Sequence, residues 1–202
     1  MTGVCGPVRS VAIAVAVAGL LAARPAVAEP PPSPPVTEAK DTNGDGKPDL
    51  WITREGSRPV RLERDRNGDG QPDVWGVYTY PAKDQSRLVV VVDRNHDGRP
   101  DYWRLEVNHL PVREWGDLNF DGRVDTWTYY APNSRAKQWV VMDKNFDGKP
   151  DARFHYGADG TRPDAGEVDE NFDGTPDRVF GTLPKDRPAL DDPPVVDLRR
   201  AP

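Results

Sequence analysis

Cysteine is almost absent from this chain of 202 residues, which contains one, Cys5. Histidine occurs three times, at no spacing that suggests a triad or a zinc site. This scarcity excludes the disulfide framework common in small exported proteins, and it argues against a transition-metal centre. The chain also lacks the G-x-S-x-G, H-E-x-x-H and phosphate-loop motifs of common enzymes. We therefore expect a protein that is not an enzyme.

Long hydrophobic runs are also missing, because the run Val11–Ala23 has only thirteen residues, too few to span a bilayer. Arg9 precedes this run, and the small-x-small sequence Ala26-Val27-Ala28 follows it. This order predicts a secretory signal peptide over residues 1–28. The expected mature protein is exported to the periplasm or the medium and has no cysteine and no membrane span. A permanent membrane anchor is the less favoured alternative.

One pattern, D-x-N-x-D-G-x-x-D, occurs six times and dominates the chain. Each copy has carboxylates at positions 1, 5 and 9 and an amide oxygen at position 3. The glycine at position 6 permits a positive φ, which turns these side chains toward one point. Together with the position 7 carbonyl, they form a set of hard oxygen donors. Such donors favour Ca²⁺ over Mg²⁺ and over transition metals.

The sequence thus predicts up to six Ca²⁺ ions. The expected side-chain ligands are Asp41, Asn43, Asp45 and Asp49; Asp65, Asn67, Asp69 and Asp73; Asp93, Asn95, Asp97 and Asp101; Asp117, Asn119, Asp121 and Asp125; Asp143, Asn145, Asp147 and Asp151; and Asp169, Asn171, Asp173 and Asp177. The alternative is that the loops are only hairpin turns, which also favour Asn, Asp and Gly. Turns do not explain three Asp and one Asn at invariant offsets, because three carboxylates packed together without a cation repel one another.

The acidity of the chain is concentrated in these loops, which hold eighteen of its 33 acidic residues. It therefore says little about the charge of a partner. The 27 Lys and Arg residues are scattered and form no basic stripe, so we expect no nucleic-acid partner.

The loops resemble the first half of an EF-hand loop and the calcium loops of dockerin and thrombospondin type 3 repeats. They match most closely the D-x-D-x-D-G-x-x-D loops of FG-GAP repeats. The resemblance covers about a third of the chain. It implies Ca²⁺ ligation by the matching residues, including direct binding by the position 9 Asp, and it implies no partner. The chain departs from EF-hands at position 12, where those loops need a bidentate Glu and this chain has Ile52, Gly76, Arg104, Thr128, Phe154 and Phe180.

The segments between the loops favour strands over helices. The first Asp residues are 24, 28, 24, 26 and 26 residues apart, and even spacings arise when a hairpin lengthens by one residue in each strand. Runs such as Arg87–Val92 and Lys137–Met142 are β-branched or aromatic, and turn clusters separate them. We expect an all-β fold over residues 41–183, an antiparallel meander of ten to twelve short strands with every calcium loop on one edge. A rolled sheet or β-sandwich is the alternative.

The flanking segments are rich in proline. Residues 29–40 are expected to be an extended linker, and residues 184–202 a disordered or loosely docked tail.

The aromatic residues follow the same repeat. Tryptophan occupies position 11 of the first four copies (Trp51, Trp75, Trp103 and Trp127) and should line one face of the sheet, where Trp115 and Trp139 also fit a core. In the last two copies the aromatic moves to position 12, so the row should falter there. Phe120, Phe146 and Phe172 at position 4 are expected to pack loop against loop.

Two functions fit these observations. The first is an exported, non-catalytic calcium-binding repeat protein with a structural or adhesion-like role. The alternative is a recognition module that binds a cell-surface protein or a polysaccharide through its Trp-lined face. A third possibility, an enzyme accessory like dockerin, is disfavoured because no helices are expected beside the loops.

Overall fold

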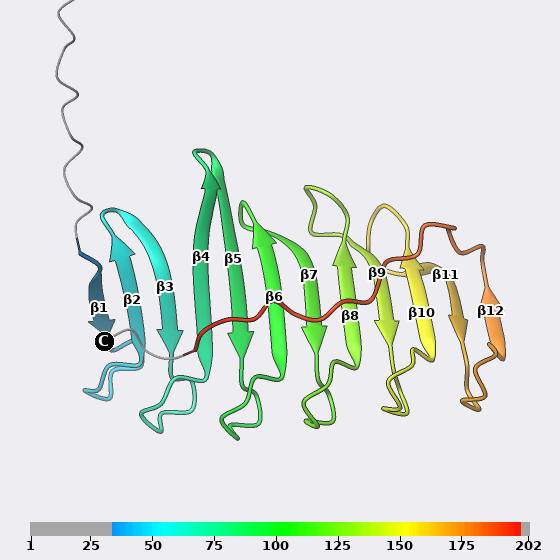
Figure 1. Ribbon diagram of the computed structural model, residues 1–202, viewed down its shortest axis with the longest axis horizontal. Helices are drawn as coiled ribbons and strands as arrows, with labels where there is room; N and C mark the ends of the chain where they lie inside the picture. Colours follow the sequence, from blue (N-terminus) through cyan, green and yellow to red (C-terminus); the bar gives the residue numbers. More distant parts are fainter. Residues whose placement is uncertain (1–33, 199–202) are drawn as a thin grey trace, which may run out of the picture. The chain divides into compact units, whose positions relative to one another are not determined.

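The computed structural model describes residues 34–198, which fall in one compact unit. Twelve strands form a single antiparallel sheet in which each strand pairs with its neighbours in the sequence (Figure 1). The strands are β1 (Val36–Lys40), β2 (Leu50–Glu55), β3 (Arg58–Arg64), β4 (Val74–Ala82), β5 (Gln85–Val92), β6 (Tyr102–Val107), β7 (Leu110–Gly116), β8 (Thr126–Tyr130), β9 (Lys137–Met142), β10 (Ala152–Tyr156), β11 (Pro163–Val168) and β12 (Arg178–Phe180). The expected all-β meander is confirmed, as one open sheet. The predicted signal peptide lies outside the described residues.

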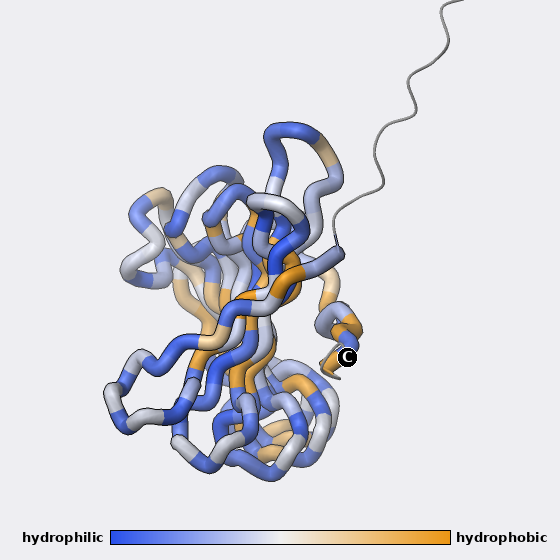
Figure 2. The backbone as a smooth tube through the Cα atoms, turned by 90° about the vertical axis from the view of Figure 1, so that its left-hand side faces the viewer, coloured by the Kyte–Doolittle hydropathy of each residue, from blue (hydrophilic) through white to orange (hydrophobic). Residues whose placement is uncertain are grey.

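All six repeat loops lie at the same end of the strands, along one long edge of the sheet, because each connects an odd-numbered strand to the next even-numbered one (Figure 1). The plain turns occupy the opposite edge. In the turn between β6 and β7, Asn108 and His109 have φ values of 50° and 64°, which is the backbone of a two-residue hairpin turn. Hydrophobic residues run through the strands, while the loops at the two edges are mostly hydrophilic (Figure 2).

Strand β1 lies within the segment expected to be a linker. Its residues pair in register with β2, from Val36 opposite Arg54 to Lys40 opposite Leu50. The reason is that the first loop, like the other five, needs an incoming strand to hold its two ends together. The ordered array therefore begins before Asp41.

One face of the sheet carries a continuous row of cross-strand neighbours, and we call it the aromatic face. From β1 to β12 the row is Ala39, Trp51, Glu63, Trp75, Val91, Trp103, Trp115, Trp127, Val141, Arg153, Glu167 and Val179. The expected alignment of the four position 11 tryptophans is confirmed. The aromatic side chains leave this row at β10 and β12, as expected. Phe154 and Phe180 come one residue later and lie on the opposite face, where their ring centroids are 6.4 Å apart.

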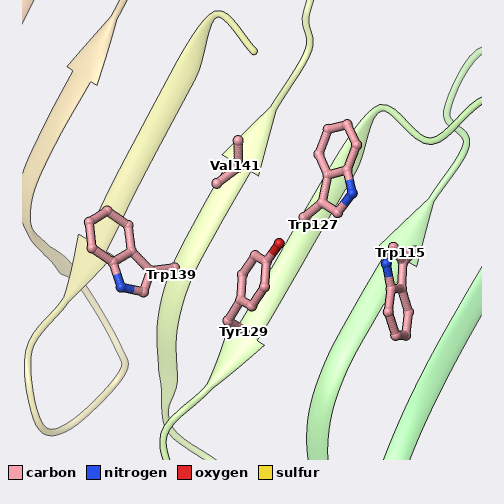
Figure 3. Packing of buried hydrophobic residues seen from close by; sticks show 5 residues of the cluster. All are labelled: Trp115, Trp127, Tyr129, Trp139 and Val141. Atoms are coloured by element: carbon pink, nitrogen blue, oxygen red, sulfur yellow. The ribbon is translucent and has the colours of Figure 1, made fainter. Parts of the chain in front are cut away.

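The core is built on this face at β7, β8 and β9. Trp115, Trp127, Tyr129, Trp139 and Val141 form one buried cluster and project to the same side of these strands (Figure 3). Trp115 is 3% exposed and Val141 is 1% exposed. A single-layered sheet has no second sheet to cover such residues, so another part of the chain must exclude water from them.

Residues 184–198 provide that cover and form what we call the strap. They contain no strand or helix, and they return from β12 across the aromatic face towards β3 (Figures 1 and 2). Near the middle of the sheet, the indole N–H groups of Trp115 and Trp127 donate to the carbonyl oxygen of Asp191 at 2.9 and 3.1 Å. We expected this segment to be disordered or loosely docked, and its lack of regular structure agrees with its prolines. Its position is set by side chains of the sheet that no local signal in the segment reveals.

The two ends of the strap are also attached. The guanidinium of Arg187 donates to both carboxylate oxygens of Glu167, at 2.7 and 3.1 Å. At the far end, Arg61 of β3 donates to the carbonyl oxygens of Asp197 and Leu198, at 2.8 and 2.9 Å. The strap therefore crosses the sheet from β11 to β3. Within residues 34–198 no helix is long and apolar enough to cross a membrane.

Candidate metal centre

Each repeat loop is closed by the same set of hydrogen bonds, which loop 3 (Asp93–Asp101) illustrates. The N–H of Gly98 donates to Oδ2 of Asp93 at 2.8 Å. The N–H of Asp97 donates to Oδ1 of Asn95 at 3.1 Å, and the N–H of Arg99 donates to Oδ1 of Asp97 at 2.8 Å. The equivalent three bonds occur in all six loops. The side chains at positions 1, 3 and 5 are thus folded back into the loop, as the spacing predicts.

The position 9 Asp joins the two ends of each loop. In loop 3, Oδ2 of Asp101 accepts hydrogen bonds from the N–H groups of Arg94 and Asn95, at 2.7 and 3.2 Å. The bond from position 2 recurs in the other five loops. All 24 predicted ligand residues therefore lie in six equivalent loops on one edge, and hydrogen bonds hold the four of each loop in one small turn.

The carboxylates at the ends of the loops are buried, which is costly for an ion. Around Asp101, the exposed side chain of Arg94 places its Nε 3.9 Å from Oδ1. Ten of these twelve Asp residues are 2–6% exposed, and the remaining two, Asp41 and Asp177, are exposed and belong to the first and last loops. The buried oxygens Oδ1 of Asp73, Oδ1 of Asp93 and Oδ1 of Asp101 have no hydrogen-bond partner. A buried carboxylate oxygen without a donor is costly. These oxygens are therefore suited to a cation that approaches from the loop interior.

Burial and neighbouring charges also disfavour the ionised forms. Burial raises the pKa of Asp101 above its ordinary value, and the nearby charge of Asp93 raises it further, against hydrogen bonds from Arg94 and Asn95 that lower it. Burial likewise raises the pKa of Asp125, with additional repulsion from Asp117 and Asp121. The three acids of this fourth loop are thus close enough to repel one another, which a divalent cation would reverse.

The acids do not form a ready-made metal centre by themselves. Among residues 34–198, no group of three or more His, Cys, Asp or Glu side chains is arranged so that it could hold a metal ion. Two of the expected donors in each loop are neutral oxygens, from the Asn and from the position 7 carbonyl. The three acids are also engaged by N–H groups of the loop. The oxygen donors present fit Ca²⁺ in kind.

Position 4 of the loop adopts a left-handed backbone, which the sequence pattern did not predict. Gly44 and Gly68 have φ values of 81° and 77°, but Phe120, Phe146 and Phe172 have φ values of 61–63° at the same position. These three side chains are 40–47% exposed. A positive φ is strained for a bulky residue. The glycine at this position in the first two loops was the available signal.

His96 also occupies position 4, and sequence reasoning had assigned it no role. Its Nδ1 lies 3.5 Å from Oδ2 of Asp73, the last acid of the preceding loop. A hollow of about 380 Å³ beside it is lined by Arg66, Asn67, Asp93, Arg94 and His96. Loops 2 and 3 thus contact one another through a side chain that differs from its counterparts in the other five loops.

Main-chain hydrogen bonds connect the loops in a chain along the edge. The N–H of Asp93 donates to the carbonyl of Asp73 at 2.9 Å, and the N–H of Asp117 donates to that of Asp101 at 2.8 Å. The same bond from the first Asp of one loop to the last Asp of the previous loop occurs at every junction. The position of each loop therefore depends on its neighbours.

Comparison with protein families supports the resemblance for part of the chain. A family model described as an FG-GAP-like repeat matches residues 41–103. The match covers the first three loops and the strands between them, so this region is similar to FG-GAP-like repeats. Comparison with curated proteins found no match, and comparison with solved structures found none.

Proposed function

We propose that this is a calcium-binding β-repeat protein in which each loop holds one Ca²⁺. In each loop the ion is held by the Asp side chains at positions 1, 5 and 9, the Asn at position 3 and the carbonyl at position 7. The observation that carries the proposal is that Oδ1 of Asp93 and Oδ1 of Asp101 are buried in one loop and neither accepts a hydrogen bond, although Nε of Arg94 lies 3.9 Å from the latter. The ion supplies positive charge that offsets their repulsion.

The ions have a structural role in this proposal. Calcium at the loops fixes the ends of the strands, and the bonds between loops transmit this order along the edge. FG-GAP-like repeats fit a β-repeat protein with an adhesion-like role and are typical of exported proteins. We therefore propose a calcium-stiffened module in the periplasm or outside the cell.

The substitution Asp101→Asn tests the site because its effect should change sign with calcium. In EDTA the variant is expected to be more stable than the wild type, because it removes a buried charge and keeps an acceptor for Arg94 and Asn95. In millimolar Ca²⁺ it is expected to be less stable, because it loses one carboxylate ligand. Thermal unfolding in both conditions measures the two signs, and calorimetric titration should show one Ca²⁺ fewer than in the wild type.

The difference in stability between Asp101→Asn and the wild type should depend on pH, because the pKa of Asp101 is raised in the folded state. Since the pKa of Asp101 is raised, the folded state binds its proton more tightly than the unfolded chain does. The destabilisation due to its charge is thus present at neutral pH and disappears as the pH falls through the raised pKa. In EDTA, the advantage of the Asn variant should shrink on acidification.

The matched control is Asp84→Asn, which removes an exposed acid at the plain turn between β4 and β5. It should leave the stoichiometry and both melting temperatures unchanged. A calcium-independent effect of Asp101→Asn, or equal stoichiometry in the two proteins, would exclude the proposed site.

A further inference from the structure

The strap is bound to the aromatic face largely through its main chain. Trp115 and Trp127 donate to the carbonyl oxygen of Asp191, and the hydroxyl of Tyr129 donates to the carbonyl oxygen of Ala189 at 2.7 Å. Every extended peptide has carbonyl oxygens at this spacing. These three contacts therefore recognise the conformation of a peptide more than its sequence.

The strap is also extended enough to match the width of the sheet. Between the contacts at Tyr129 on β8 and Arg61 on β3 there are five strand spacings, or roughly 24 Å at ~4.8 Å each. The strap residues at these contacts are Ala189 and Asp197, and eight residues in a polyproline conformation span roughly 25 Å. The prolines of the strap suit this conformation. Pro184, Pro188, Pro193 and Pro194 are all half-buried.

Charge adds a preference for acidic peptides. The guanidinium of Arg113, which lies over the ring of Tyr129, pairs with the carboxylate of Asp191. Further along, Arg61 and Arg87 line a groove of about 410 Å³ against residues 194–197 of the strap. A row of aromatic rings with N–H and O–H donors, flanked by arginines, is the chemistry that binds extended proline-containing acidic segments.

The strap is held less firmly than the strands. It makes no β-ladder with the sheet, and none of its residues is fully buried. Val195 is completely exposed. By contrast, Trp115 and Val91 on the aromatic face are 3% and 1% exposed. A segment with few buried contacts opens at a lower cost than the sheet that it covers.

We propose that the aromatic face is a binding surface for extended, acidic, proline-containing segments of other proteins, and that the strap is its built-in competing ligand. This function is separate from calcium binding, because the strap and the loops are attached to different parts of the strands. When the strap lifts, the same indole and hydroxyl donors become available to the carbonyl groups of a partner segment.

The test uses the full chain in excess calcium and a fluorescein-labelled peptide with the sequence of residues 184–198. The strap is weakened by the double substitution Arg187→Ala and Asp191→Ala, which leaves the aromatic face intact. Fluorescence anisotropy should show peptide binding several-fold tighter to this variant than to the wild type, because a tethered competitor acts at an effective concentration of about millimolar. Adding Tyr129→Phe to the variant should weaken binding again.

Two controls make the result specific. Asp84→Asn, at the opposite edge from the loops, should bind the peptide as the wild type does, and a peptide with alanine at all four prolines should bind more weakly. In the wild type, about 10 mM peptide should shift the indole resonances of Trp115 and Trp127.

If the peptide does not bind to the strap-weakened variant, the proposal is overturned. If that variant does not fold, the wild type decides, and unchanged indole resonances on addition of peptide would overturn the proposal. Concentration-dependent dimerisation without added peptide would show that a second copy is the occupant, and would overturn the assignment to another protein.

Discussion

Removal of calcium with EDTA is expected to lower the melting temperature of this protein by tens of degrees. At ~1 mM Ca²⁺ and a Kd of ~10⁻⁴ M, typical of extracellular modules, each site adds about 1.4 kcal/mol and six add about 8 kcal/mol. For a domain of this size, each kcal/mol corresponds to about 2–4 °C. The effect is comparable to the whole net stability of an ordinary domain.

The physical reason is that ten buried carboxylates at the loop ends otherwise repel one another and lack full solvation. Circular dichroism and calorimetric melting with Ca²⁺ and with EDTA measure the effect. An equal concentration of Mg²⁺ is the control and should restore little of the loss, because Mg²⁺ requires a tighter octahedral site. Identical melting curves in calcium and in EDTA would show that the loops are turns and not metal sites.

Replacement of Trp115 by alanine is expected to have the largest effect of any single substitution on the sheet. The ring is 3% exposed, lies between Trp103 and Trp127 in the cross-strand row, and donates to the strap. Loss of a buried tryptophan costs about 3–5 kcal/mol. Urea denaturation in the presence of calcium measures this loss.

Two further substitutions separate the contribution of the indole hydrogen bond from that of buried area, and a central position in the row from one near β1. Trp115→Phe keeps most of the buried area but removes the N–H donor, so it should cost much less than alanine. Trp51→Ala changes a half-buried member of the same row near the β1 edge and should also cost less. A loss below about 1 kcal/mol for Trp115→Ala would mean that the aromatic face is not the main core.

The parts of the fold that follow from local spacing were predictable. Even spacings between the loops led to antiparallel hairpins in register, and the structure pairs every strand with its sequence neighbours. The position 11 tryptophans lie in one row because alternate residues of a strand share a face. The change to Phe154 and Phe180 moved the aromatic side chains to the other face for the same reason.

The parts that depend on distant contacts were not predictable from local patterns. The proline content of residues 184–202 indicated a segment without regular structure, but its binding to Trp115, Trp127 and Tyr129 depends on how the sheet brings these rings together. Similarly, Val36–Lys40 reads as the end of a proline-rich linker, and it becomes a strand because β2 offers a free edge. Within the loops, the recurring Asp, Asn and Gly positions were readable from the sequence, but the contact of His96 with the preceding loop was not.

The course of the strap has a consequence for how the array can be attached to anything else. The described chain enters at β1, and at Leu198 it has returned to β3. Residues 34 and 198, the two ends of the described chain, therefore lie toward the same end of the sheet. A partner that contacts the three-residue strand Arg178–Phe180 or the last loop therefore binds at the end of the sheet farthest from both ends of the described chain.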